Sequence, residues 1–157
     1  MFSKRAAFTL IEMLIVLGVI GLLLTIFVFS LYSKQAENRD LKRVSDIQTL
    51  RQAMSVVKTN TGTFERALCS LGNVSACAAQ KDSELLGLLP QLANLNDPKS
   101  PSASCSKIEN CQSGICNYGF SKIEADDYEI LFYLEKGVND FSESGCYIAT
   151  PQGIRKN

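Results

Sequence analysis

Residues 6–32 read AAFTLIEMLIVLGVIGLLLTIFVFSLY, and no charged residue follows Glu12 until Lys34. The segment from Met13 to Tyr32 is uncharged. As an α-helix rising ~1.5 Å per residue, it would extend about 30 Å. That length matches the hydrocarbon thickness of a bilayer. The sequence therefore predicts one membrane-spanning helix close to the N-terminus.

The carboxylate of Glu12 stands at the entrance of this apolar span. A charged side chain at the centre of a bilayer costs about 2.5–3.5 kcal/mol on insertion scales, and less near the interface. A helix that served only as an anchor would gain from leucine at this position. Glu12 therefore either has a role in helix packing or lies at the interface with its carboxylate in water.

The pentapeptide FTLIE at residues 8–12 follows a short basic segment and directly precedes the uncharged span. In this order and place it resembles the class III signal of type IV pilins and type II secretion pseudopilins. In that family a basic leader is removed on the cytoplasmic side, and the new N-terminal phenylalanine is methylated. The resemblance implies a leader at residues 1–7, cleavage between Ala7 and Phe8, and N-methylation of Phe8. The family usually has glycine before the cut, where this chain has alanine.

The resemblance also implies a role for Glu12, because the glutamate five residues into the mature chain is used by the family in filament assembly. After cleavage, Phe8 would carry a free amino group, and an ordinary α-amino group has a pKa of about 7.7–8.0. A carboxylate on a neighbouring helix, shifted along the bundle axis, would pair with this amine in apolar surroundings, where unpaired charge is expensive. Such a pair sets helix register more than it adds stability. We therefore predict that Glu12 is the assembly charge.

Two other interpretations of the N-terminus stay open. An ordinary secretory signal peptide would use Val28 and Ser30 as the small residues before a cut, although the apolar stretch exceeds the usual length of about 7–15 residues. An uncleaved single-span anchor is the other. The mass of the mature N-terminus separates the three, since the chain would begin at Phe8, near Leu31 or at Met1.

Residues 33–59 predict an amphipathic continuation of the helix. No proline occurs before Pro90, so one helix would run from about residue 8 to about residue 59, roughly 75 Å. Two helices with a hinge near Ser33 remain the alternative. Apolar residues on one face recur every three or four positions, with charged residues elsewhere: Leu41, Val44, Ile47, Leu50, Met54 and Val57.

A small antiparallel sheet is predicted over residues 113–150, with strands at 115–121, 128–135 and 146–150. Residues 60–112 read as an irregular connection, and the resemblance implies that it corresponds to the variable segment of pilin-like proteins. Within it, Ser83 is the expected N-cap of a short helix over 83–89.

A long helix, an irregular connection and a C-terminal sheet form the layout of pilin heads. The sequence therefore predicts an α+β, pilin-like fold, with an assembly helix at 8–32 and a globular head at 33–157.

All six cysteines lie in the predicted head, and an even count in an exported segment predicts disulfides. Sequence alone leaves the connectivity open. Zinc is not predicted, because the cysteine spacings do not match common sites and the chain has no histidine. The pairs that we favour are Cys69–Cys77, Cys105–Cys111 and Cys116–Cys146.

Calcium is the one alternative ligand, since hard cations prefer several oxygens and some secretion pseudopilins bind calcium in the head. The family's calcium loop is not recognisable here, so a solvated polar turn is the preferred interpretation and no cofactor or metal is predicted. The candidate donors are Glu124, Asp126, Asp127, Asp97, Asn139 and Asp140.

The composition argues against several function classes. Formal net charge is zero, and losing Lys4 and Arg5 with the leader would leave 14 basic and 16 acidic residues, a net charge of −2. Nothing in this balance indicates a nucleic-acid groove. The chain has no histidine, the usual general base, and no glycine-rich phosphate loop. We therefore expect no enzymatic activity.

We expect a structural subunit of a type IV pilus or type II secretion class filament. Its expected partners are the prepilin peptidase/N-methyltransferase, other copies, minor pilins, the inner-membrane assembly platform and, before assembly, the lipid bilayer. The single-pass precursor would lie in the cytoplasmic membrane with an extracytoplasmic head, and the filament would be extracellular or periplasmic. The alternatives are a pseudopilin that acts as a piston in type II secretion and a membrane-anchored binding module that never polymerises.

Overall fold

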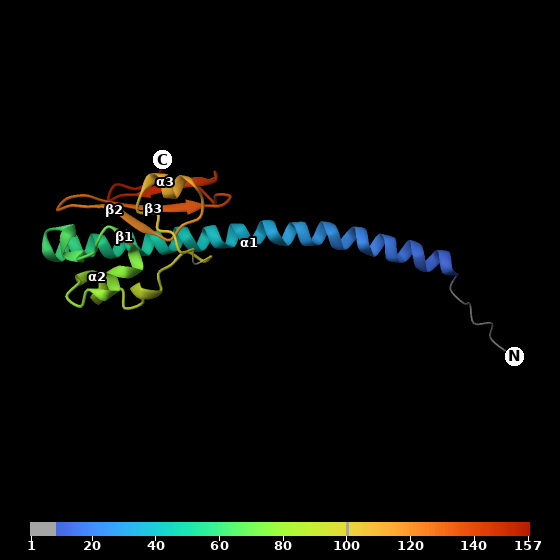
Figure 1. The fold of residues 1–157 in the computed structure, drawn as a ribbon, viewed down its shortest axis with the longest axis horizontal. Helices are drawn as coiled ribbons and strands as arrows, with labels where there is room; N and C mark the ends of the chain where they lie inside the picture. The colour runs from blue at the N-terminus through green and yellow to red at the C-terminus, as the bar shows by residue number, and fades with distance from the viewer. Residues whose placement is uncertain (1–8, 100) are drawn as a thin grey trace. The chain divides into compact units, whose positions relative to one another are not determined.

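The computed structural model describes residues 9–99 and 101–157. The chain divides into two units between Gln35 and Ala36, and each is described separately. The N-terminal unit holds the first part of helix α1 (Leu10–Thr61). The C-terminal unit, called the head below, holds the rest of α1 and the other helices and strands of the described residues (Figure 1).

Helix α1 begins directly after Thr9, whose Oγ1 accepts a hydrogen bond from the backbone N–H of Glu12 at 3.3 Å. A threonine that binds an otherwise unpaired N–H of the first turn is a typical N-cap. The helix predicted from about residue 8 to about 59 is thus found at Leu10–Thr61, and it includes Ser33, the position of the alternative hinge.

The C-terminal end of α1 is set by Gly62. Its φ is +80°, and its N–H donates to the carbonyl of Lys58 at 2.8 Å. Glycine adopts this left-handed conformation without the steric penalty of a side chain, and so it commonly ends helices.

The N-terminal unit contains the membrane-span candidate. Leu10–Val28 has 19 residues with a mean hydropathy of 2.7, and none of that window is buried within the chain. By length and composition this segment can cross a membrane. Its apolar side chains therefore need lipid or other helices as partners.

The head contains one antiparallel sheet in which sequence order equals spatial order, β1-β2-β3-β4-β5. Central β3 pairs with β2 through Phe120 and Ile130, and with β4 through Phe132 and Tyr147. The strands are β1 (Gly72–Asn73), β2 (Gly119–Ile123), β3 (Tyr128–Leu134), β4 (Gly145–Ala149) and β5 (Ile154–Lys156).

Two of the three predicted strands match β3 and β4 closely. The strand predicted at 115–121 begins four residues later, at Gly119, because Cys116 is committed to a disulfide and Asn117 forms an isolated bridge with Ser104. Strands β1 and β5 were not predicted. Both are very short, and β5 follows a turn in which the N–H of Thr150 donates to the carbonyl of Gly153.

The main core of the head lies between α1 and one face of the sheet. From α1, the predicted Val44, Ile47, Leu50, Met54 and Val57 are buried, together with Ala53. From β3 they are Tyr128, Ile130, Phe132 and Leu134, the alternate residues that share a face. Burial of these side chains is the main favourable term for docking the amphipathic part of α1.

The predicted apolar stripe is wrong at its first member. Leu41 is 42% exposed, whereas its neighbours Asp40 and Arg43 are fully buried. The reason is that this turn of α1 faces polar chain segments around Asp97 and Glu135, not the apolar face of the sheet.

The opposite face of the sheet carries a second, smaller cluster. Leu131 and Ile148 pack there with the buried Cys105, Cys111, Cys116 and Cys146. Helix α3 (Ile108–Gln112), which was not predicted, brings Cys111 over this face. Disulfides thus cover the side of the sheet that α1 leaves open.

Three disulfides are formed, and two of the favoured pairings are wrong. Cys69–Cys77 agrees with the prediction, but Cys105 pairs with Cys116 and Cys111 pairs with Cys146. Helix α3 accounts for the difference, because it places Cys111 against β4. Sequence spacing without this helix favoured the shorter loop from Cys105 to Cys111.

Removing Cys111–Cys146 is expected to cost more stability than removing Cys69–Cys77. The first closes a loop of 35 residues and the second a loop of 8. In the chain-entropy model the longer loop contributes about 1 kcal/mol more. Urea unfolding of the two double-serine variants tests this, and equal or reversed losses would contradict it.

The irregular region contains the predicted short helix as α2 (Glu84–Leu88). Ser83 is its N-cap, since Ser83 Oγ accepts a hydrogen bond from the N–H of Leu86 at 3.3 Å. Short 3-10 helices at Phe64–Ala67, Val74–Ala79 and Leu92–Asn94 complete the region. The architecture is the predicted α+β, pilin-like one: a long N-terminal helix, a small antiparallel sheet and three disulfides.

Candidate functional site

The residues predicted for maturation and assembly lie at the start of the chain. Ala7 and Phe8 lie outside the described residues. Glu12 lies in the first turn of α1 and is exposed within the chain, and its backbone N–H is bound by Thr9. It is the one charged residue in the sequence from Leu10 to Val28. Its carboxylate thus lies at the start of Leu10–Val28, a predominantly apolar and exposed segment of α1.

A buried cluster of charges lies in the head, where α1 meets the end of β3 and the loop at Asp97. Arg43 is at its centre and is fully buried. Its Nε donates to Asp97 Oδ2 at 2.5 Å, and one terminal nitrogen donates to Asp40 Oδ1 at 2.7 Å and to Glu135 Oε1 at 2.8 Å. Arg43 thus binds three carboxylates from three segments of the head.

Each of the three carboxylates has further donors. Asp40 accepts backbone N–H bonds from Glu135, Lys136 and Gly137 at 2.8–3.0 Å. Asp97 accepts from the N–H of Lys99 at 2.9 Å.

Glu135 also binds two cations beside Arg43. Arg39 Nε donates to it at 2.7 Å, and Lys99 Nζ lies 2.9 Å from Glu135 Oε2. Three positive and three negative side chains therefore balance. This balance makes the burial of Arg43, Asp40 and Asp97 tolerable, whereas Arg39 and Lys99 remain partly exposed.

Sequence periodicity placed these charges on the solvent side of α1, and the cluster was missed. The spacing could have predicted that Asp40 and Arg43 are buried, because positions 40, 43 and 47 share one face of an α-helix. Asp40 and Arg43 thus extend, toward the N-terminus, the buried face that includes Val44 and Ile47. Their partners Asp97 and Glu135 are more than 50 residues away in the sequence, and no spacing rule connects them.

The cluster has an electrostatic consequence at Glu135. Hydrogen bonds from Arg39, then from Lys99 and Arg43, hold the pKa of Glu135 well below its usual range, although partial burial acts in the opposite direction. For Arg43, burial favours loss of the charge, but the bonds to Asp97, Glu135 and Asp40 outweigh it and raise the pKa of Arg43. Glu135 and Arg43 are therefore both charged in the native head at neutral pH.

Lowering the pH is expected to reduce the free energy of unfolding of the head, because Glu135 becomes protonated. Because its folded pKa lies below the unfolded value of about 4.3, its contribution is complete above that pH and is lost as the pH falls toward the folded pKa. The difference in free energy of unfolding between wild type and Glu135→Gln should therefore shrink between pH 6 and pH 3. Urea titrations at both pH values measure it, and a difference independent of pH would contradict the ionic role.

A second polar contact links α1 to the residue that directly precedes β2. The hydroxyl of Tyr118 donates to Asp46 Oδ2 at 3.1 Å. Burial, followed by the charge of Asp46, raises the pKa of Tyr118. The phenol therefore stays protonated and remains a donor.

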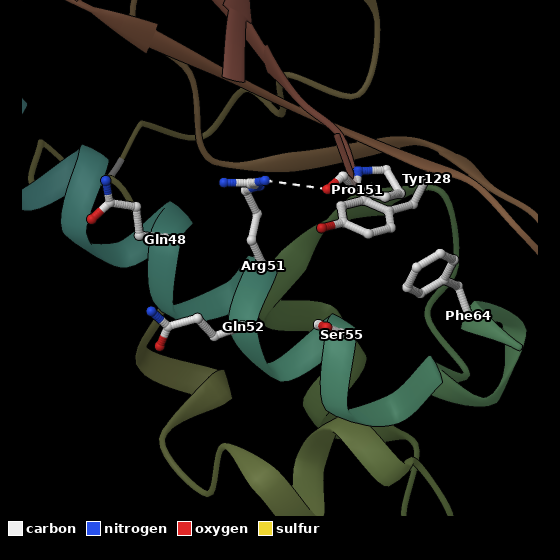
Figure 2. Close-up of a pocket in the computed structure, with 7 residues that line it drawn as sticks. All are labelled: Gln48, Arg51, Gln52, Ser55, Phe64, Tyr128 and Pro151. Carbon is white, nitrogen blue, oxygen red and sulfur yellow. Dashed lines mark hydrogen bonds between the residues drawn. The ribbon is translucent and has the colours of Figure 1, made fainter. Parts of the chain in front are cut away.

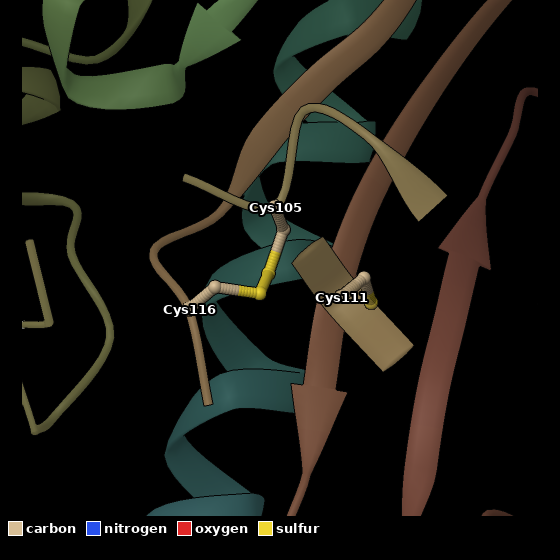
Figure 3. Close-up of side chains that lie close together, drawn as sticks. All are labelled: Cys105, Cys111 and Cys116. Carbon is tan, nitrogen blue, oxygen red and sulfur yellow. A yellow bond between two sulfur atoms is a disulfide. The ribbon is translucent and has the colours of Figure 1, made fainter. Parts of the chain in front are cut away.

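The cysteines raise the question of a metal centre. The sulfur atoms of Cys105, Cys111 and Cys116 lie within 4.8 Å of one another, and all three residues are buried. Figure 3 shows the bond from Cys105 to Cys116 with Cys111 beside it. Cys111 is bonded to Cys146, so none of the three offers a thiolate. Disulfide bonding accounts for this sulfur cluster.

Four of the six calcium candidates, Asp97, Glu124, Asp126 and Asp127, are engaged in other contacts. Asp97 is bound by Arg43. Lys122 Nζ lies 3.2 Å from Glu124 and 3.0 Å from Asp127, and Lys58 pairs with Asp126. No group of three carboxylates within metal-binding distance occurs in the described part of the chain.

The comparisons with known proteins concern the N-terminal segment. Residues 2–28 match the family model described as the prokaryotic N-terminal methylation motif. No curated protein and no solved structure matched the chain. The motif indicates a structural protein and implies processing by prepilin peptidase and pilin-type assembly in general. Residues 2–28 of this chain are therefore a prokaryotic N-terminal methylation motif, the class III signal of type IV pilin-like precursors.

Proposed function

We propose that this chain is the precursor of a filament subunit of the type IV pilus or type II secretion class. The observation that carries the proposal is the methylation motif, joined to an apolar helical segment, Leu10–Val28, whose one charge is Glu12. In this proposal prepilin peptidase cuts between Ala7 and Phe8 and methylates Phe8. The helix holds the precursor in the cytoplasmic membrane until it packs against the helices of other copies.

The features of the head support an extracytoplasmic location in this proposal. All six cysteines form disulfides, and disulfides persist in oxidising compartments such as the periplasm and the cell surface. The head would thus be presented outside the cytoplasmic membrane, with α1 as its connection to the bilayer or to the filament.

The mechanism of assembly follows from charge and packing. In the membrane, the side chains of Leu10–Val28 contact lipid, and in a filament they would contact equivalent helices. Apolar packing contributes to the register between such helices, and a polar or charged residue specifies it more sharply. A pair between Glu12 of one copy and the amine of Phe8 of the next would set it, because a shift of one helix turn would leave both charges without a partner in a medium of low dielectric constant.

Deleting the gene in the native cell and imaging sheared surface material by electron microscopy tests the proposal. We expect filaments that label with antibodies to the head, and loss of that label in the deletion strain. If the subunit belongs to a secretion pseudopilus, secreted enzymes will instead accumulate inside the deletion strain. A protein that stays monomeric in the envelope at high abundance, with neither effect on deletion, would contradict both forms of the proposal.

A further inference from the structure

A pocket of about 510 Å³ lies in the head between α1 and the end of β4. A volume of this size can hold a monosaccharide or a ligand of similar size. Figure 2 shows that residues from consecutive turns of α1 form one side of it, and that Phe64, Tyr128 and Pro151 form the other. The pocket belongs entirely to the head.

Arg51 is the one charged residue that lines this pocket. Its Nε donates to the carbonyl of Thr150 at 3.0 Å, and a terminal nitrogen donates to the carbonyl of Pro151 at 3.3 Å. These neutral acceptors fix the guanidinium in place without cancelling its charge. No carboxylate of the described residues forms an ion pair with Arg51. The pocket is therefore pre-organised for an anion, and a planar guanidinium suits a carboxylate.

The α1 side of the pocket also supplies neutral hydrogen-bonding groups. Gln48, Gln52 and Ser55 follow each other at intervals of three or four residues, so they share one helix face, and all three are exposed. Amides and hydroxyls both donate and accept hydrogen bonds. This set matches a ligand with several hydroxyl groups, which also donate and accept.

The opposite side is formed by two aromatic rings and Pro151, and the Tyr128 hydroxyl on this side interacts with Arg51. Phe64 and Tyr128 meet edge to face with ring centroids 4.9 Å apart, and Pro151 continues this wall. Both aromatic side chains are almost fully buried, so their positions are fixed by the core. Because Phe64 is 5% and Tyr128 1% exposed, only the edges of these rings reach the pocket, and with Pro151 they would contact one edge of a sugar ring by dispersion.

We propose that this pocket binds a carboxylated monosaccharide, a pyranose uronic acid. Its carboxylate would lie at Arg51, its hydroxyls at the glutamine amides and Ser55, and one edge of its ring against Pro151 and the exposed edges of the aromatic rings. A neutral sugar would lack the charge contact. A peptide C-terminus would offer the carboxylate but fewer groups that both donate and accept. The inference is independent of filament assembly, since every lining residue belongs to the head.

Titration of the full chain in detergent micelles, followed by NMR of the glutamine side-chain amides, tests the proposal. The probes are galacturonate, the matched neutral sugar galactose, and a tripeptide with a free C-terminal carboxylate. We expect galacturonate to shift the amide signals of Gln48 and Gln52, and galactose to bind about tenfold more weakly or worse. Absence of galacturonate binding, or tripeptide binding as tight as that of galacturonate, would overturn the proposal.

Two pairs of variants locate the site. Gln52→Glu adds a negative charge beside Arg51 and should weaken galacturonate binding about tenfold or more, since like charges repel. The same change at the exposed Gln112 of α3 is the control. Arg51→Gln should abolish the preference for galacturonate over galactose, with the exposed Arg155→Gln as its control. Equal affinities in a variant and its control would place binding elsewhere and overturn the proposal.

Discussion

Replacing Arg43 with methionine is expected to lower the free energy of unfolding of the head by about 3–5 kcal/mol, because it leaves buried carboxylates without their cation. Methionine has a similar length, so lost volume contributes little. Asp97 is affected most, since two of the bonds from Arg43 go to its carboxylate. Asp40 keeps its three backbone donors. Urea unfolding followed by tyrosine fluorescence measures the loss.

Three further variants show whether the loss comes from the buried cluster. Arg66→Met changes an exposed arginine and should stay within about 0.5 kcal/mol of wild type. Arg43→Lys keeps the charge but not the planar set of donors, so its loss should be intermediate. Asp97→Leu added to Arg43→Met should recover part of the loss, because it removes the unpaired buried charge. A loss for Arg43→Met no larger than that for Arg66→Met would contradict the account of the cluster.

Replacing Glu12 with alanine or glutamine is expected to reduce incorporation into filaments by about 100-fold or more while membrane insertion stays intact. The reason follows from the proposed pair: without Glu12, the amine of Phe8 stays unpaired in a helix bundle, at a cost of about 3–5 kcal/mol. Insertion does not suffer, because removing a charge from an apolar span favours the membrane state. Quantifying subunits in the sheared filament and membrane fractions measures both effects.

The matched control for this prediction is Glu65→Ala, which removes an exposed carboxylate from the head. We expect it to assemble at the wild-type level. Incorporation of the Glu12 variants at that same level would show that Glu12 only occupies the interface. Loss of the variants from the membrane fraction would instead mean that the residue acts before assembly.

The parts of the fold that sequence predicted well depend on local periodicity. The stripe from Val44 to Val57 and the alternation in β3 both repeat at intervals that only one type of element satisfies. The cap at Ser83 was also predictable, because a cap needs only a hydroxyl and a helix that follows it.

The parts that sequence missed depend on contacts between distant segments. Cys111 meets Cys146 because α3 lies over β4, and five residues are too few to show helical periodicity. Arg43 is buried because it binds Asp97 and Glu135. In the sequence it lies among other charged residues, and it is predicted to be solvent-exposed when these distant partners are not known. The pocket at Arg51 could not be predicted from the sequence either, because its lining residues come from distant segments of the chain. The signal for maturation is contiguous, and it was recognisable from residues 8–12, the short basic segment before them and the apolar span after them.

The most direct test of the central claim is the mass of the N-terminal peptide of the protein isolated from cells. The proposed maturation predicts a chain that begins at Phe8 and carries one methyl group on its amine. A chain that still begins at Met1, or one cut near Leu31, would contradict it.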